Sequence, residues 1–150
     1  MKLTGLDVFD SSIQRTNAWL KELMQELNWS DHRKTYVAFR CVLHALRDHM
    51  AVNDAVRFGQ VLPMLIRGFY FDQWNPADKP LPLRARSDFI SVLSSYMLRD
   101  DEGARTNAEI VARAVFRLLS RKAMDGEIED VQYLLPPAIL DLWPPTLRAA

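Results

Sequence analysis

The feature that most constrains the fold of this chain is a similarity between its two halves at a spacing of about 73 residues. The alignment needs no gap and pairs Leu20 with Leu93, Met24 with Met97, Arg40 with Arg113, Val42 with Val115, Leu46 with Leu119, Leu62 with Leu135, Pro63 with Pro136 and Ile66 with Ile139. Each apolar pair keeps its position in the helical period. The sequence therefore predicts two tandem copies of one helical unit.

The length of 150 residues fits one domain, so we expect the two repeats to share one core. Repeat one is predicted over about 11–74 and repeat two over about 87–143. Between them, Pro76, Pro80 and Pro82 predict an extended, basic connector over 75–86. The tail over 144–150 is expected to be frayed.

Apolar residues recur every three to four positions, and no segment shows the strict alternation of a half-buried strand. The pattern predicts an all-α fold of about eight helices, four in each repeat, packed with pseudo-twofold symmetry. Ser11 with Gln14 and Thr106 with Glu109 have the spacing of capping boxes. In repeat one, Ser30 or Asp31 is expected to cap a helix at 32–50, Asn53 to cap a helix at 54–61, and Pro63 to start a further helix. In repeat two, Ser87 is expected to cap a helix that ends at a break at 100–103, and further helices are predicted at 127–134 and from Pro136.

Acidic and basic residues balance at 19 each, so no overall field attracts nucleic acid or an anionic membrane. Cys41 is the only cysteine, which excludes an intrachain disulfide and fits a reducing cytosol. No stretch approaches the roughly 18 apolar residues of a membrane span, and the first residues lack the apolar centre of a leader. We expect a cytoplasmic protein without membrane contact.

Two groups of side chains on the helix at 32–50 have spacings that suit chemistry. Cys41 and His44 could form a thiolate and its base, and His44, Asp48 and His49 could ligate a metal. A buried cysteine and a solvated helix face explain the same residues more simply. No catalytic triad order, phosphate loop or zinc spacing is present. We therefore assign no catalytic residue, metal or cofactor, and favour a protein without enzymatic activity.

Basic residues gather in two parts of the sequence. Arg40, His44 and Arg47 share one face of the helix at 32–50, which we interpret as its exposed side. The connector adds further cations next to an aromatic residue that could stack on a base. A local anion or nucleic-acid surface would then comprise this basic helix face together with Trp74, Lys79, Arg84 and Arg86. The balanced net charge argues against nucleic acid as the partner.

Several short motifs follow one another in a characteristic order along the chain. They are Leu43-His44-Ala45-Leu46-Arg47-Asp48, Leu62-Pro63-Met64-Leu65-Ile66-Arg67-Gly68-Phe69-Tyr70, Trp74-Asn75-Pro76, Phe89, Gly126-Glu127-Ile128-Glu129-Asp130-Val131, Leu134-Leu135-Pro136 and Leu142-Trp143-Pro144. Their order resembles the bacterial domain-of-unknown-function family 2267, over roughly 11–144. The resemblance implies an all-helical, internally duplicated cytosolic protein from a family often associated with stress responses. It implies no activity and no catalytic residues.

Three functions remain open from the sequence. The first is a non-catalytic module that binds a protein partner or a second copy, through a groove between the repeats or through the segment 74–86. Exposed Tyr70 or Trp74 beside Arg67 would serve as the contact residues. The alternative is a small-molecule or metal-binding protein, with or without catalysis, whose pocket lies between the repeats. The third is phosphate or nucleic-acid binding at the basic patch.

Overall fold

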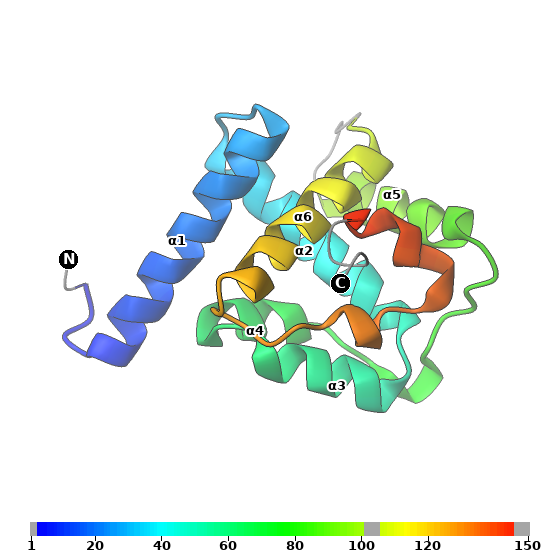
Figure 1. Cartoon of the computed structure of the whole chain (residues 1–150), viewed down its shortest axis with the longest axis horizontal. Helices are drawn as coiled ribbons and strands as arrows, with labels where there is room; N and C mark the ends of the chain where they lie inside the picture. The colour runs from blue at the N-terminus through cyan, green and yellow to red at the C-terminus, as the bar shows by residue number, and fades with distance from the viewer. Residues whose placement is uncertain (1–2, 101–105, 146–150) are drawn as a thin grey trace.

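The structure is a computed structural model that describes residues 3–100 and 106–145. Over these residues it contains six α-helices, three short 3-10 helices and no strand, which confirms the predicted all-α class (Figure 1). The α-helices are α1 (Asp7–Leu27), α2 (His32–His49), α3 (Val52–Val61), α4 (Met64–Phe71), α5 (Arg86–Asp100) and α6 (Ala108–Met124). The 3-10 helices are η1 (Pro76–Asp78), η2 (Gln132–Leu134) and η3 (Pro137–Leu142).

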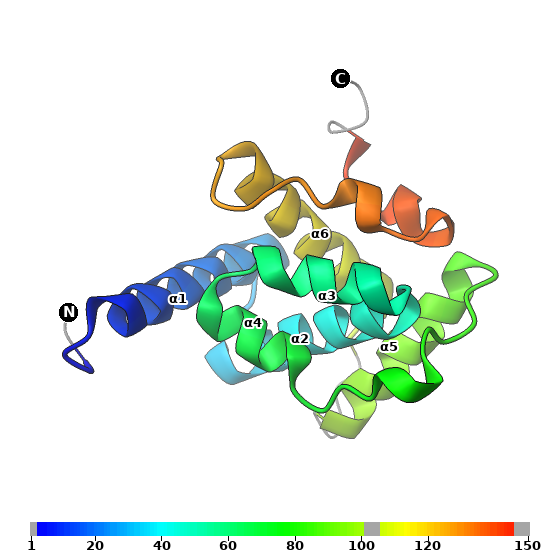
Figure 2. The same cartoon turned by 90° about the horizontal axis from the view of Figure 1, so that it is seen from below.

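Helix α2 is the centre of the bundle. It packs against α1, α4, α5 and α6, and each of its residues from Cys41 to its C-cap Met50 is buried. Helix α6 packs on α1, α2 and α5, while α3 and α4 form a pair that covers one side of α2. Figures 1 and 2 both show the N-terminal half of α1 extending beyond the rest of the bundle, with α4 beside it. In the part of the chain that the structure describes, this arrangement leaves one side of α1 and α4 without a neighbouring helix.

Several predicted helix starts are wrong, because the helices begin at other residues than the predicted caps. Helix α1 begins at Asp7, so Ser11 lies inside it and forms no capping box. The carboxylate of Asp10 instead accepts the backbone N–H groups of Leu3 and Thr4, which fixes the turn before the helix. Helix α6 is capped by Asn107, whose side chain accepts from Ile110 N, one residue after the predicted Thr106.

Of the remaining helix starts, that of α2 is as predicted and the others are shifted. Asp31 caps α2 as predicted, accepting from Lys34 N. Helix α3 begins at Val52, so the predicted cap Asn53 lies inside its first turn. Helix α5 begins at Arg86, and the carboxylate of Asp88 accepts the N–H groups of Arg84 and Ala85 in place of a Ser87 cap. Pro63 is the N-cap of α4 and lies just before its first residue.

The second half of the chain is less helical than predicted. Gly126 turns with φ of 78°, and Asp130 accepts from Gln132 N, so only η2 remains of the helix predicted at 127–134. The helix predicted from Pro136 is the 3-10 helix η3. Of the predicted break at 100–103, only Asp100 is described, as the last residue of α5. Of the predicted frayed tail at 144–150, the residues from 146 onward lie outside the described residues. None of the helices in the described residues combines the length and apolar character that crossing a membrane requires.

Candidate functional site

The C-terminal end of α4 is held by polar side chains of α2. His44 Nε2 lies 2.6 Å from Phe69 O, and Arg47 Nη1 donates to Tyr70 O at 2.6 Å and to Asp72 O at 2.9 Å. The last carbonyls of a helix have no partner within it, so these bonds satisfy groups that would otherwise be buried unpaired. Burial lowers the pKa of His44, and the charge of Arg47 lowers it further. The ring is therefore neutral, with its proton on Nε2.

The same guanidinium bonds to Asp48, and Asp48 in turn bonds to α5 through its carboxylate and to the connector through its backbone carbonyl. Arg47 Nε donates to Asp48 Oδ1 at 2.8 Å, while the Tyr96 hydroxyl donates to Asp48 Oδ2 at 2.6 Å. The backbone N–H of Leu81 donates to Asp48 O at 2.7 Å. Arg47 is only 3% exposed, so its charge depends on this set of partners.

The predicted exposed basic face of Arg40, His44 and Arg47 is therefore wrong. His44 and Arg47 are buried, because α2 is surrounded by other helices and the carbonyls at the end of α4 supply the acceptors. Arg40 is half-buried, and its guanidinium bonds to the Tyr36 hydroxyl and to Asp100 Oδ2. Helical spacing placed the three residues on one face correctly, but it did not reveal that this face points inward.

The predicted binding residues of α4 and the connector are not gathered at one place. Tyr70 is fully buried, and its hydroxyl donates to Ala55 O, so the expectation of an exposed contact residue is wrong. Trp74 is half-buried against Phe71, with ring centroids 5.7 Å apart. Arg67 is exposed on α4, with Nη2 donating to Leu62 O at 3.0 Å.

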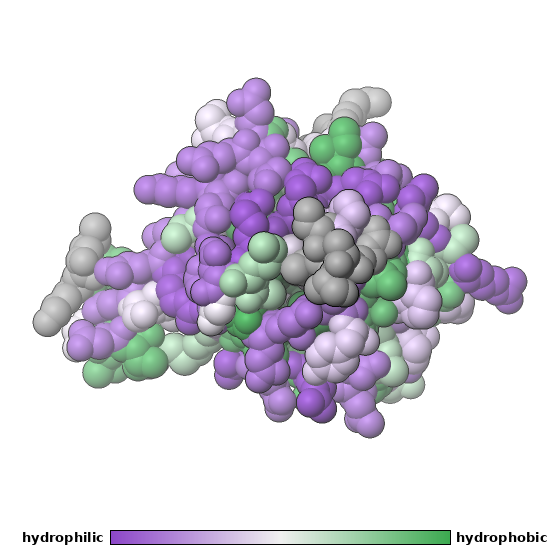
Figure 3. All heavy atoms as spheres, in the orientation of Figure 1, coloured by the Kyte–Doolittle hydropathy of each residue, from purple (hydrophilic) through white to green (hydrophobic). Residues whose placement is uncertain are grey.

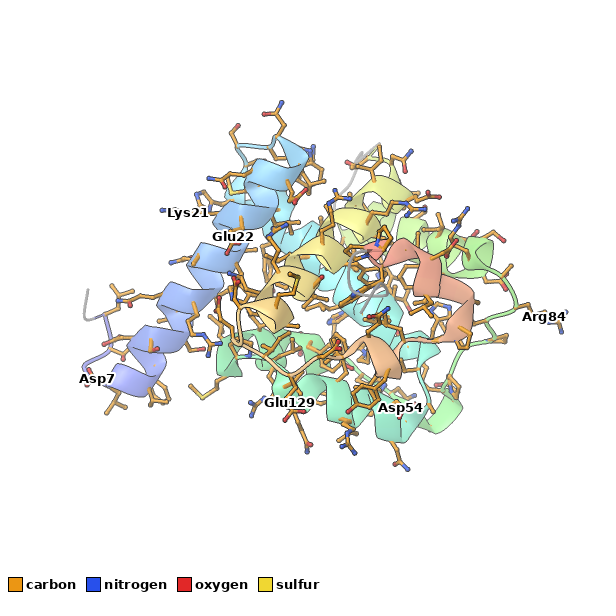
Figure 4. The ribbon with its side chains drawn as sticks, in the orientation of Figure 1. Asp7, Lys21, Glu22, Asp54, Arg84 and Glu129 are labelled. Carbon is orange, nitrogen blue, oxygen red and sulfur yellow. The ribbon has the colours of Figure 1, made fainter. Side chains whose placement is uncertain are left out.

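The cations of the connector differ in whether an ion pair already occupies them. Lys79 pairs with Asp78 at 2.9 Å, and Arg86 pairs with Asp141 at 2.7 Å. The Arg84 side chain projects from the edge of the molecule and forms no ion pair within the described residues (Figure 4). With the α2 face buried, the structure does not unite these cations into one anion-binding surface. No set of three or more His, Cys, Asp or Glu side chains within 3–100 and 106–145 has the geometry of a metal site.

Cys41 is a core residue. Its thiol lies 3.6 Å from Asp100 Oδ2, and it is fully buried. Burial raises the pKa of Cys41 to about 12, and the negative charge of Asp100 acts in the same direction. His44 bonds to Phe69 O and is therefore not arranged as the base of this thiol. A thiolate, the form that attacks electrophiles, is scarce at such a site near neutral pH.

We therefore expect Cys41 to resist thiol reagents in the folded protein. Incubation with 5,5′-dithiobis(2-nitrobenzoic acid) at pH 8 should release almost no thionitrobenzoate until denaturant is added, and then one equivalent per chain. Absorbance of the released anion measures the reaction. Full labelling of the native protein within minutes would contradict the assignment of Cys41 to the core.

A separate site lies where α4 meets the N-terminal half of α1. The two helices form the walls of a groove with a volume of about 410 Å³. The hydroxyl of Ser12 accepts from Leu65 N at 2.9 Å and ties the walls together. We call this the α1–α4 groove, and its lining residues are Thr4, Phe9, Ser12, Ile13, Met64, Leu65, Gly68 and Phe69.

Gly68 gives α4 a bare backbone inside this groove. A Cβ added there would meet nothing within 4 Å, and the residue has no positive φ. Gly59 in α3 differs, because a Cβ there would lie 2.5 Å from Phe71 Cε2 and 2.7 Å from Tyr70 Cε2. A glycine inside a helix costs about 1 kcal/mol relative to alanine. The fold needs a glycine at position 59, but nothing in the described chain needs one at position 68.

Exposed apolar side chains gather around the α1–α4 groove. Among the described residues, ten large apolar side chains are exposed, and six of them belong to segments 3–9 and 64–65. In Figure 3 apolar atoms cluster at the lower left, where the N-terminal end of α1 lies. Single exposed apolar residues are common on proteins, but a cluster beside a hollow marks a contact surface. The six residues are Leu3, Leu6, Val8, Phe9, Met64 and Leu65.

The comparisons with known proteins give a family. The family model described as "Uncharacterized conserved protein (DUF2267)" matches residues 16–142, which is most of the chain. The chain belongs to the DUF2267 family. No curated protein matches its sequence. The DUF2267 match includes the α4 wall of the groove with Gly68, whereas the α1 wall, from Thr4 to Ile13, precedes it.

Sequence reasoning missed the groove of this DUF2267 protein. Ile66 and Tyr70 are the buried residues of α4, while Met64, Leu65 and Gly68 line the groove. A signal was present, because α4 carries more apolar residues than one buried stripe needs, and it includes a glycine. A segment that is apolar on both sides predicts either full burial or an exposed apolar surface, and in the structure Met64 and Leu65 are exposed.

Proposed function

We propose that the protein is a non-catalytic interaction module that binds a protein through the α1–α4 groove. The observation that carries the proposal is Gly68, a helical glycine that the fold does not require and that lies in the α4 wall of an exposed apolar groove. A missing side chain allows another backbone or side chain to approach the helix closely. The loss of helix propensity at Gly68 is then offset by a contact outside the described chain.

The lining of the groove supports a protein as the occupant. Its accessible surface is apolar, and the hydroxyl of Ser12 is already engaged with Leu65 N. Grooves between helices commonly accept the apolar face of a partner helix. A small polar metabolite would find few groups to orient it, because specificity in ligand pockets comes from placed polar groups.

We also infer that the two halves of the chain are copies of one unit. In the register of the sequence match, α1, α2 and α4 correspond to α5, α6 and η3. Their packing supports this: α1 contacts α2 and α6 as α5 contacts α6 and α2, and α4 contacts α1 and α2 as η3 contacts α5 and α6. Superposing an experimental structure on itself tests the inference. One rotation of about 180° should match all three pairs, and different rotations for each pair would contradict it.

The same register gives the α1–α4 groove a counterpart in the second half. Phe9, Met64 and Leu65 correspond to Pro82, Pro137 and Ala138, which line a second groove beside the connector. Ile13 and Gly68 correspond to Arg86 and Asp141, which form the ion pair at 2.7 Å. An ion pair thus occupies the second half at the positions where Ile13 and Gly68 line an open groove in the first half. This difference supports a binding role for the α1–α4 groove that the second half does not share.

The test is to fill the groove without disturbing the fold. Gly68→Leu should remove partner binding and leave the protein folded, since the new side chain enters open space. Wild type and variant, each with a C-terminal affinity tag, are purified from cells that also produce the untagged chain, and the retained proteins, untagged copies of this chain included, are measured by mass spectrometry. Leu98→Asp, at an exposed position on α5, is the control and should retain the partner. Equal retention by wild type and Gly68→Leu would contradict the proposal.

A further inference from the structure

We infer that the occupant of the α1–α4 groove is the N-terminal segment of a second copy of this chain, so that two copies form a reciprocal dimer. This inference rests on the proposed function and adds the identity of the partner. The chain carries both parts of such a contact. Phe9, Met64 and Leu65 line the groove, while Leu3, Leu6 and Val8 stand outside it as apolar projections.

The projections are held in a defined position and yet are exposed. Asp10 Oδ1 accepts from Leu3 N at 3.1 Å and from Thr4 N at 2.8 Å, which fixes the turn that carries them. Leu3 is 62% exposed, Leu6 52% and Val8 61%. Covering such side chains gives roughly 25 cal/mol per Å² of apolar surface. Their own groove does not cover them, so an ordered apolar segment and an open apolar groove both lack a partner among the described residues of one chain.

The charges around the groove suit a second copy. Asp7 lies in the first turn of α1 and projects from the end of the molecule (Figure 4), while Arg67 lies on α4. Within the described residues neither of them forms an ion pair. A twofold contact that places α1 of one copy against α4 of the other brings a carboxylate toward a guanidinium twice. The formal net charge of zero means that two copies do not repel each other overall.

Twofold symmetry limits the assembly to two copies. If each copy inserts its segment into the groove of the other, both grooves and both segments are covered, and no free site remains for a third chain. The second half of the chain supports the idea that such grooves are covered. There Arg86 and Asp141 bridge the positions that correspond to Ile13 and Gly68, so that site is closed within the chain. The first groove has no such internal bridge.

Sedimentation equilibrium on the untagged protein, from about 1 to about 100 µM, tests the dimer. We expect wild type to reach the mass of two chains, and Gly68→Leu and Leu6→Asp each to weaken association by at least about ten-fold. Thermal melts should show both variants folded. The control Leu98→Asp changes an apolar residue of similar exposure, 57%, on α5, and it should associate like wild type.

The outcomes separate this inference from the proposed function. A wild type that is monomeric throughout, or a dimer that both variants leave unchanged, overturns the inference. If the protein is monomeric but retains another protein in a Gly68-dependent manner, the groove is an interaction site and only the identity of its occupant is wrong. If Leu98→Asp disrupts the dimer as strongly as Leu6→Asp, the interface lies elsewhere and the inference is likewise overturned.

Discussion

Replacing Arg47 by methionine is expected to lower the free energy of unfolding by about 3–5 kcal/mol, because the substitution breaks a buried charge network from one side. Asp48 would lose the guanidinium at 2.8 Å and remain as a buried carboxylate, supported only by the Tyr96 hydroxyl. The carbonyls of Tyr70 and Asp72 would lose their donors at the same time. Methionine retains much of the side-chain volume, so the loss reports on polar contacts more than on a cavity.

The control for this change is Arg67→Met on the exposed side of α4. Both variants remove one guanidinium from the protein, but Arg67 contacts only carbonyls near the surface. We expect its effect to stay within about 0.5 kcal/mol. Urea unfolding followed by far-ultraviolet circular dichroism measures both values. A loss below about 1 kcal/mol for Arg47→Met would contradict the role of Arg47 as the residue that holds the end of α4.

The second large effect is expected from one substitution made at two helical glycines. Gly59→Ala should destabilise the protein by about 2 kcal/mol, because its Cβ would meet the rings of Phe71 and Tyr70, and the buried Tyr70 cannot move freely. Gly68→Ala should stabilise it by about 0.5–1 kcal/mol, since alanine has the higher helix propensity and the new Cβ meets nothing within 4 Å.

Differential scanning calorimetry of the two glycine variants and the wild type tests both signs together. The comparison is direct, because both glycines lie inside helices and neither has a positive φ. Melting temperatures that fall for both variants would mean that Gly68 is required by the fold, and the main support for the interaction groove would be lost. A rise for both would show that the rings beside Gly59 yield at little cost.

The sequence predicted the helical class and the central helix well, for reasons that particular residues make clear. Phe39, Val42, Leu43 and Leu46 are all buried, because a stripe at helical spacing has no other favourable arrangement. The Asp31 cap is correct, since its carboxylate faces the N–H of Lys34. Periodicity identifies faces, however, and cannot say how many neighbours surround a helix. That is why Arg47 was placed outside although it is buried.

The candidate site was harder to predict than the fold. Gly68 is an ordinary residue in the sequence, and only the empty space around its backbone indicates that the fold does not need it. Met64 and Leu65 resemble core residues, and they are exposed because no helix of residues 3–100 and 106–145 covers this side of α1 and α4. The cation Arg86 looked free because its partner, Asp141, is 55 residues away in the sequence and lies on η3. In each of these cases, residues that are distant in the sequence determine whether the side chain is exposed or paired.

The most direct test of the central claim is a photo-crosslinking residue at position 64, inside the groove, compared with the same residue at position 110. Met64 and Ile110 are both exposed, at 42% and 56%, but Ile110 lies on α6, outside the lining of the groove. We predict that irradiation in the producing cells links position 64 to a protein chain, either a second copy or another protein, and leaves position 110 unlinked. Absence of a protein adduct at position 64, or equal adducts at both positions, would contradict the assignment of the α1–α4 groove as an interaction site.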